Sequence, residues 1–459
     1  MVRPWGLSAP IIVLLICLPL MRPLRHPDPS LISDDEQARL ATIQAIVEHR
    51  TLAIENTQFH ATRNVIVRPD GHTYSDQSPV MAALLSGPYW VMYRCGLSLD
   101  KDPILTEYLL TLLGVTLPIA FGTGLLYRMG RIFELRRPYR AALALGVVVA
   151  SGWISYGTVL NAGAAAAALV VLGTGCLVQA TLTSKRYYGF AWCALAGLSL
   201  SLAATYELTA AFFLILLLPV LFAFRWPLGQ RFVGSGLYLA AMALPLLLYG
   251  GLNKAVTGDL KPGFLHTELR SLDAGSLHNA TLAGDASWDE DEGTGFWHAV
   301  GRACGRILSA LLGTHGLLSH FPILLLGILG VTMVMHRHWP GTTKILASAA
   351  LAGASAVLLA YGLARTEWKD AMFANRWFLV FLPMVLFWSG AWLRKSHRPS
   401  SWAMVVVLLS FSTVTGLVGA TDPQPRQGYN NYTAAVAFME LVSNSQPPSS
   451  QRTTLVNGQ

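Results

Sequence analysis

The sequence predicts an all-α, polytopic membrane protein with about eleven transmembrane helices. Three observations support this fold class. Of the 459 residues, 53% are hydrophobic and only 13% are charged, about half the charged fraction of a typical soluble domain. The mean hydropathy is +0.46. Apolar runs near the length of a membrane span recur along the chain, and clusters of Arg, Lys or Trp close them.

The apolar runs divide the chain into transmembrane bundles and the segments between them. Residues 1–21 carry the first span, and we expect it to stay uncleaved because no small-x-small cleavage site precedes Arg22. Further spans form one bundle over 104–252 and a second over 317–420. The individual spans are predicted at 6–21, 104–127, 141–158, 162–182, 189–205, 208–224, 233–252, 317–335, 345–363, 377–393 and 402–420.

The basic residues predict the orientation of these spans. With a cytoplasmic N-terminus, the short turns at 158–161 and 206–207 lie outside and contain no Lys or Arg, as the positive-inside rule requires. The net charge of +8 is spread between apolar runs instead of forming a stripe, so we expect no nucleic-acid partner. The predicted cytoplasmic loops contain Arg128, Arg131, Arg136, Arg137, Arg140, Lys185, Arg186, Arg225, Arg231, Arg337, Lys344, Arg394, Lys395 and Arg398.

Three long segments are then extracytoplasmic, namely residues 22–103, 253–316 and 421–459. In the first, Ser33 and Glu36 have the spacing of a capping box, which predicts a helix from Asp34. Leu40, Ile43, Ile46 and Val47 then recur at helical spacing opposite Arg39, Gln44 and Glu48, which predicts an amphipathic helix on the membrane surface. Counting residues 79–96 as a span would reverse the orientation, so we expect a second surface helix there.

The first outer segment carries two motifs. An Asp-Glu pair opens the first surface helix in Ser33-Asp34-Asp35-Glu36-Gln37-Ala38-Arg39. The second surface helix follows Gly71-His72-Thr73-Tyr74-Ser75-Asp76-Gln77-Ser78-Pro79. In these features the chain resembles the GT-C-fold membrane glycosyltransferases, namely the bacterial branch of the dolichyl-phosphate-mannose protein mannosyltransferases and the lipid A aminoarabinose transferases. Gln77 stands where that family commonly has a phosphate-binding Lys.

Two later segments extend the resemblance over essentially the whole chain. The entry to one span, Gly316-Leu317-Leu318-Ser319-His320-Phe321-Pro322, is similar to the family's Gly-Leu-Phe-Ser-Tyr-x-Pro segment. Another span opens with Asn375-Arg376-Trp377-Phe378-Leu379 and continues to Pro383, similar to the family's Arg-Tyr-Leu-x-Pro segment. The resemblance implies a GT-C-like helical bundle with its active site on the extracytoplasmic face.

The chemistry of such a transferase suggests roles for individual residues. Asp35 is the expected base for the acceptor hydroxyl, and Glu36 would position acceptor or sugar hydroxyls. Arg376, at the outer end of a span, is the first candidate for binding the leaving phosphate. Other outer cations are Arg63, Arg68, Lys254, Arg365 and Lys369. Further expected substrate contacts are Asp34, His72, Tyr74, Asp76 and Gln77.

Each of these residues also has a simpler interpretation. The acids of the first helical turn favour the positive end of the helix dipole, and an arginine at a span end anchors a helix in the interface. Asp34, Asp35 and Glu36 would then be caps, and Arg376 an anchor. The acidic stretch from Asp285 to Glu292 fits a solvated loop better than a cation site.

The sequence therefore predicts a bacterial inner-membrane glycosyltransferase whose partners are the bilayer, a polyprenyl-phosphate sugar donor and an extracytoplasmic lipid, glycan or protein acceptor. Direct attack on the sugar would invert its anomeric centre. A transporter or lipid flippase and an inactive GT-C-like relative stay open as alternatives, the second because of Gln77. No motif requires a cofactor, and a divalent metal ion at Glu36 stays open. The sequence identifies neither the sugar nor the acceptor.

Overall fold

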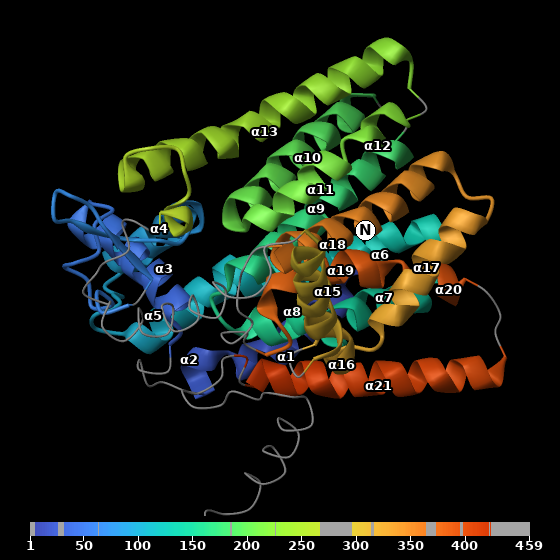
Figure 1. Cartoon of the computed structure of the whole chain (residues 1–459), viewed down its shortest axis with the longest axis horizontal. Coiled ribbons are helices and arrows are strands. Elements are labelled where there is room, and N and C mark those ends of the chain that lie inside the picture. The colour runs from blue at the N-terminus through green and yellow to red at the C-terminus, as the bar shows by residue number, and fades with distance from the viewer. Residues whose placement is uncertain are drawn as a thin grey trace, which may run out of the picture.

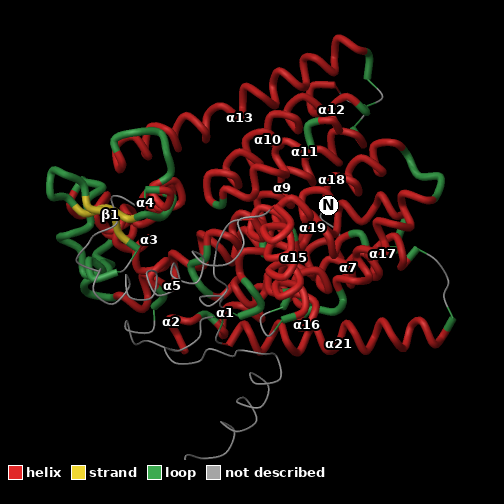
Figure 2. The backbone as a smooth tube through the Cα atoms, in the orientation of Figure 1, coloured by secondary structure: helices red, strands yellow, loops and turns green. Residues whose placement is uncertain are grey.

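The computed structural model describes residues 5–25, 32–62, 64–183, 186–224, 226–266, 296–313, 316–363, 373–394, 398–421 and 423. These residues are predominantly helical (Figures 1 and 2). The one sheet among them is an antiparallel hairpin of β1 (Val65–Val67) and β2 (Thr73–Ser75), in which Ile66 pairs with Tyr74. The all-α membrane fold predicted from the sequence is confirmed.

The helices follow one another with few long connections in the described part of the chain. In chain order they are α1 (Trp5–Leu20), α2 (Arg22–Arg25), α3 (Asp34–Gln44), η2 (Ala45–His49), α4 (Pro79–Arg94), α5 (Pro103–Thr111), η3 (Leu112–Thr116), α6 (Leu117–Met129), η4 (Gly130–Phe133), α7 (Arg137–Val149), α8 (Gly152–Ser155), η5 (Tyr156–Thr158), α9 (Ala162–Leu182), α10 (Arg186–Tyr206), η6 (Leu208–Ala210), α11 (Ala211–Leu216), α12 (Pro219–Phe222), α13 (Leu228–Thr257), η7 (Gly263–Leu265), α15 (Phe296–Leu312), α16 (Leu317–His320), α17 (Leu324–His336), α18 (Gly341–Leu363), η11 (Arg376–Phe378), α19 (Leu382–Phe387), α20 (Ser389–Leu393) and α21 (Pro399–Thr421).

The described residues include seven helices long and apolar enough to cross a membrane, so the chain is a multi-pass membrane protein. These are Gly6–Arg25, Pro103–Phe133, Ala162–Leu182, Tyr187–Tyr206, Leu228–Thr257, Gly341–Leu363 and Pro399–Thr421. Two bent pairs raise the number to as many as nine. One pair, Arg137–Val149 with Gly152–Thr158, bends by 63°, and the other, Val300–His320 with Leu324–His336, bends by 93°.

The predicted count of eleven spans is not confirmed. Nine of the eleven predicted positions coincide with the seven long helices and the two bent pairs. The other two coincide with shorter apolar helices over Leu208–Phe222 and Leu382–Leu393, which are too short to cross a bilayer as straight helices. The hydropathy of a run identifies a segment that avoids water. It does not show where the helix within that segment breaks.

Segments predicted to lie on the same side of the membrane come together in the structure. At one end of the bundle, α3, α4 and the hairpin gather beside the C-terminal end of α13 (Figure 1), where the Arg68 guanidinium donates to the Ala255 carbonyl at 3.3 Å. At the other end, Arg394 donates to Glu134 at 2.5 Å and lies over the Trp339 ring. Which end faces the cell exterior stays a prediction.

The first predicted surface helix, α3, begins where the capping pattern predicts, but its polar face is not exposed as expected. The Ser33 hydroxyl accepts the Glu36 amide at 3.4 Å, and α3 starts at Asp34. Arg39 and Gln44 on the predicted polar face are 7% and 1% exposed. The polar face expected to be exposed to water is therefore corrected, because Arg39 and Gln44 are buried against polar partners. A place for α3 at the membrane surface stays a prediction.

The second predicted surface helix corresponds to α4, and its place on the outer surface stays a prediction. It spans only 16 residues, does not qualify as a membrane span, and packs against α3 and α13. Pro79 occupies its first turn, where the missing amide hydrogen costs nothing. The Ser78 hydroxyl just before it donates to the Thr205 carbonyl at the end of α10, which connects the segment before α4 to the transmembrane bundle.

Candidate active site

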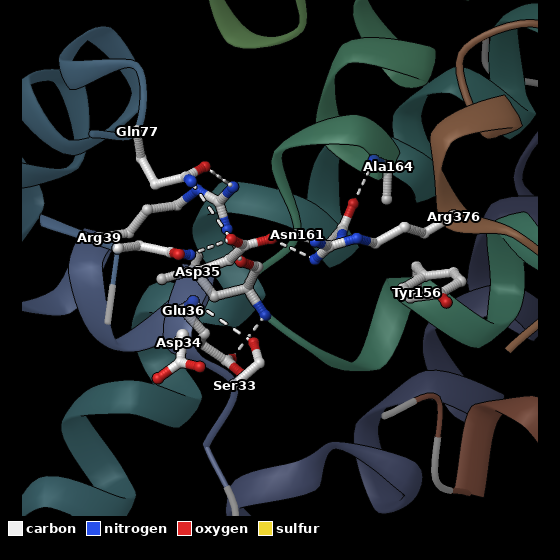
Figure 3. A network of polar contacts seen from close by, with 12 residues as sticks. Ser33, Asp34, Asp35, Glu36, Arg39, Gln77, Tyr156, Asn161, Ala164 and Arg376 are labelled. Atoms are coloured by element: carbon white, nitrogen blue, oxygen red, sulfur yellow. Dashed lines mark hydrogen bonds and ion pairs between the residues drawn. The ribbon is translucent and has the colours of Figure 1, made fainter. Parts of the chain in front are cut away.

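Asp35 is the centre of a polar network at the start of α3. Its carboxylate pairs with the Arg376 guanidinium, accepts a hydrogen bond from the Asn64 amide, and accepts another from the Gln77 amide at 3.2 Å (Figure 3). The Asp35 and Arg376 side chains are 14% and 17% exposed, so the pair is largely removed from water without being sealed. The structure thus brings together three residues that sequence reasoning had selected separately.

An unusual stretch of backbone places Arg376. Ala374 and Asn375 adopt left-handed conformations with φ of 49° and 55°, which residues other than glycine rarely adopt. The chain turns sharply there and begins the short helix η11. Strained backbone of this kind is concentrated at functional sites. The turn delivers Arg376 to the start of α3, hundreds of residues earlier in the sequence.

The network keeps Asp35 ionised. Burial alone would raise the pKa of Asp35, but the charges of Arg376 and Arg39 and the hydrogen bonds from Arg376 and Asn64 outweigh it and lower the pKa. Burial likewise opposes a charge on Arg376, yet the adjacent Asp35 carboxylate raises the pKa of the guanidinium. The pair therefore offers a carboxylate and a cation within one partly open site.

Gln77 links the parts of the network. Its amide nitrogen donates to Asp35 at 3.2 Å and to Asp76 at 3.0 Å, and its carbonyl oxygen accepts from Arg39 at 3.0 Å. Arg39 also donates to the Leu160 carbonyl at 3.2 Å. Sequence reasoning placed Arg39 only on a polar helix face. Its position four residues after Asp35, on the same side of one helix, was the signal that it belongs to the site.

Glu36 is buried next to the site, and its carboxylate contacts supporting residues instead of being exposed in the site. It is 1% exposed, and its carboxylate accepts the Leu160 amide at 2.9 Å and lies 3.5 Å from Arg22 Nε. Arg22 in turn pairs with the buried Glu107. Asp34 is partly exposed in the same turn, and its carbonyl accepts from Thr62 at 2.9 Å. The catalytic role predicted for Glu36 and the binding role predicted for Asp34 stay predictions.

Two of the predicted substrate contacts lie outside the network. Tyr74 packs in a small apolar cluster with Ala53, Ile66 and Val256, and Arg68 lies over its ring. The exposed His72 imidazole pairs with Glu55 at 2.7 Å. Asp76, which follows the hairpin, is connected to the network because it accepts a hydrogen bond from Gln77. Binding roles for His72 and Tyr74 remain predictions.

The structure describes two of the other candidate phosphate-binding cations, Arg68 and Lys254, and neither belongs to the network. Arg68 pairs with Asp70 at 3.5 Å, and Lys254 is exposed near the end of α13. Arg63, Arg365 and Lys369 lie outside the described residues, as does the acidic stretch 285–292. Within the described ranges, no group of three or more His, Cys, Asp or Glu side chains is arranged to hold a metal ion.

A second carboxylate lies near the pair. Glu207, in the turn between α10 and η6, accepts the Tyr361 hydroxyl at 3.2 Å. Burial raises the pKa of Glu207, although Tyr361, Arg376 and Arg39 act in the opposite direction. In the sequence, Glu207 belongs to the short turn at 206–207 and to none of the motifs.

No protein-family model and no curated protein sequence matches this chain. Solved structures do match over most of it. The oligosaccharyltransferase of Archaeoglobus fulgidus in the apo form has a TM-score of 0.57 at 12% identity, over 93% of this chain and 57% of its own. ArnT from Cupriavidus metallidurans in the apo state has a TM-score of 0.54 at 16% identity, over 88% of this chain and 62% of its own.

This chain therefore spans about three fifths of the length of the solved structures that it matches. Both of those proteins are glycosyltransferases of the GT-C fold. At these identities the likeness concerns the arrangement of the backbone. The chain has the GT-C fold, as its sequence motifs predicted.

Proposed function

We propose that this protein is a glycosyltransferase that moves a sugar from a polyprenyl-phosphate carrier to an extracytoplasmic lipid, glycan or protein. The observation that carries the proposal is the Asp35–Arg376 pair, which lies in a GT-C fold at the end of the bundle where the predicted outer segments meet. Solved structures of similar fold include ArnT bound to undecaprenyl phosphate, at a TM-score of 0.52 and 14% identity, and archaeal AglB in complex with an inhibitory peptide and a dolichol-phosphate, at 0.53 and 13%.

The proposed reaction divides between these two side chains. The acceptor oxygen attacks the anomeric carbon, and the bond from that carbon to the phosphate oxygen breaks with its electron pair leaving on the phosphate. Asp35 accepts the proton of the attacking hydroxyl, which becomes acidic as the bond forms. Arg376 binds the departing phosphate through two parallel hydrogen bonds. One direct displacement inverts the anomeric centre.

Other residues would act around this pair. Gln77 and Asp76 would contact sugar or phosphate near Asp35, and Asp34, His72 and Tyr74 are kept as further candidate substrate contacts. Glu36 would act through the position of α3. The setting would be a bacterial inner membrane, with the N-terminus in the cytoplasm and the site outside. Participation of a divalent metal ion is decided by comparing transfer with and without a chelator.

A transporter explains the charged residues less well. Transporters place substrate-binding charges near the middle of membrane helices. The charged groups of this network lie instead outside the helices long enough to cross a membrane, with Asp35 in the first turn of α3 and Arg376 in the first turn of η11. A site at the membrane surface suits a lipid-linked phosphate whose tail stays in the bilayer.

The test is transfer by the purified full-length protein in nanodiscs, with a panel of polyprenyl-phosphate sugars and with envelope lipids, glycans and peptides as acceptors. Asp35→Asn should lower the rate at least 100-fold, in line with the loss of a general base. Asp259→Asn, a matched change of an exposed outer carboxylate 56% accessible to solvent, should leave the rate unchanged. Wild-type protein that transfers no sugar, or Asp35→Asn that keeps more than about a tenth of the rate, contradicts the proposal.

A further inference from the structure

We propose that Glu207, Tyr361 and Trp377 form the subsite that holds the sugar ring of the lipid-linked donor, beside the phosphate site at Arg376. This inference rests on the proposed transferase function and extends it to sugar recognition. No sequence motif pointed to these three residues as a group.

Three separate elements deliver the subsite. Glu207 comes from the turn after α10, Tyr361 from the last turn of α18, and Trp377 from η11. The Tyr361 hydroxyl donates to Glu207 at 3.2 Å. The Tyr361 and Trp377 rings stack, with centroids 5.7 Å apart and planes inclined by 28°. The buried Phe378 ring supports Tyr361 edge-on at 5.8 Å.

These side chains have the chemistry that a sugar ring requires. A sugar presents an apolar face of C–H groups and a rim of hydroxyls, and aromatic rings with polar tips match such amphipathic surfaces. A carboxyl group accepts hydrogen bonds from the hydroxyl rim. Glu207, Tyr361 and Trp377 are each only partly buried, so a ligand can reach them. A side chain needed only for packing would more commonly be enclosed, as Phe378 is.

The subsite adjoins the proposed reaction centre. Trp377 follows Arg376 directly in the chain. The charges of Arg376, Arg39 and Asp35 also act on the pKa of the Glu207 carboxyl. A phosphate bound at Arg376 therefore brings its attached sugar next to Trp377. The anomeric carbon lies between phosphate and sugar, so the two subsites together would orient the bond that breaks.

The experiment compares two ligands that differ only in the sugar. Wild-type protein in nanodiscs is titrated with undecaprenyl phosphate alone and with the undecaprenyl-phosphate sugar that it binds most tightly. Trp377→Ala and Glu207→Ala should each weaken binding of the sugar-bearing lipid roughly 3- to 10-fold, the size of one aromatic or hydrogen-bonding contact. Neither should weaken binding of undecaprenyl phosphate alone more than about twofold. Trp377→Phe should retain most of the affinity for the sugar-bearing lipid.

The control and the contradicting outcomes separate this inference from the proposed function. Trp90→Ala changes another outer tryptophan, 51% exposed on α4, and should affect neither ligand. Equal losses for both ligands in Trp377→Ala and Glu207→Ala would show a purely structural role, and no loss would exclude the subsite. Either result overturns the inference while wild-type transfer stands. Wild-type protein that binds neither lipid overturns the proposed function and this inference with it.

Discussion

Asp35 lies among basic side chains, and this environment limits what each of them can do. Arg376 contacts the carboxylate directly, whereas Arg39 reaches it through Gln77. A carboxylate held ionised by two cations is a weak base in the resting site. Binding of an anionic phosphate at Arg376 would compete for that guanidinium, loosen its hold on Asp35 and raise the basicity of the carboxylate at the moment when the acceptor hydroxyl loses its proton.

Donor binding should depend on Arg376. Arg376→Ala removes the partner of the phosphate and should weaken binding of undecaprenyl phosphate by about 2–5 kcal/mol, roughly 30-fold or more. Arg376→Lys keeps the charge and loses the planar fork, so its loss should be smaller. Arg68→Ala is the matched control, because that arginine pairs with Asp70 and lies outside the network. Titration of the purified variants measures these affinities, and unchanged affinity in Arg376→Ala would leave this residue as an interfacial anchor.

Rising pH should weaken phosphate binding through Glu207. Burial raises the pKa of Glu207 above the ordinary 4.5, so the carboxyl loses its proton at a higher pH than an exposed glutamate does. The new negative charge then opposes the attraction between Arg376 and an anionic phosphate. The charged and titratable groups that act on this carboxyl or respond to it are Arg376, Arg39, Asp35, Tyr361 and Tyr249.

This pH dependence is measured by titrating undecaprenyl phosphate into wild-type and Glu207→Gln protein between about pH 4.5 and 8. The ligand titrates identically in both experiments, so the difference between the two profiles reports Glu207. We expect the advantage of Glu207→Gln over wild-type to grow with pH. A constant difference across the range would contradict the prediction.

At the scale of elements, α3 is fixed by buried charges as much as by apolar contacts. Leu40 and Ile43 are fully buried, yet Glu36 at its start is equally enclosed. Glu36 satisfies the backbone amide of Leu160 and lies beside Arg22, so one carboxylate joins α3, α2 and the turn that precedes α9. Because Asp35 is the preceding residue, this attachment determines where the proposed base stands.

Glu36→Ala should therefore destabilise the protein by about 3–5 kcal/mol, the cost of removing one member of a buried ion pair. Glu36→Gln keeps an oxygen for the Leu160 amide and should cost less. Thermal unfolding of the purified variants in detergent measures the difference, with Asp259→Asn as the exposed control. If Glu36→Ala unfolds like wild-type, α3 is held by its apolar contacts alone.

At the scale of the whole molecule, the two ends of the bundle differ in what they gather. The Asp35 network lies at the end that holds α3 and α4, and α17 and α20 lie toward the opposite end (Figure 1). Arg394, which follows α20, pairs there with Glu134 and lies over the Trp339 ring. If the positive-inside rule holds for the arginine-rich end, the network faces the cell exterior.

Cysteine labelling of intact cells decides the orientation. Cys95 and Cys304 are exposed and are first replaced by Ser to give a silent background. Single cysteines within residues 50–70, 280–295 and 440–455 should react with a membrane-impermeant maleimide, and those near positions 134, 185 and 397 should react only after the cells are opened. Labelling of position 134 in intact cells would reverse the topology and place the site in the cytoplasm.

The sequence by itself determined the membrane class, the approximate positions of the apolar helices, the start of α3 and the GT-C fold. Each depends on local composition or short motifs: hydropathy averages over one span, and the Ser33 cap involves residues three apart. Asp35 and Arg376 also appeared in the sequence as separate candidates. Their selection relied on motif resemblance, and nothing in the sequence joined them.

Only the tertiary structure decided how these residues meet. Hydrogen bonds and ion pairs act over a few ångströms in space, whatever the separation along the chain. Asp35 therefore contacts Arg376, and Glu207 contacts Tyr361, only after the bundle has assembled. The same reason explains the misread polar face of α3. Helical periodicity distinguishes polar from apolar faces, but Arg39 is buried because Gln77 and Leu160 supply its hydrogen-bond acceptors, and those acceptors come from other parts of the fold.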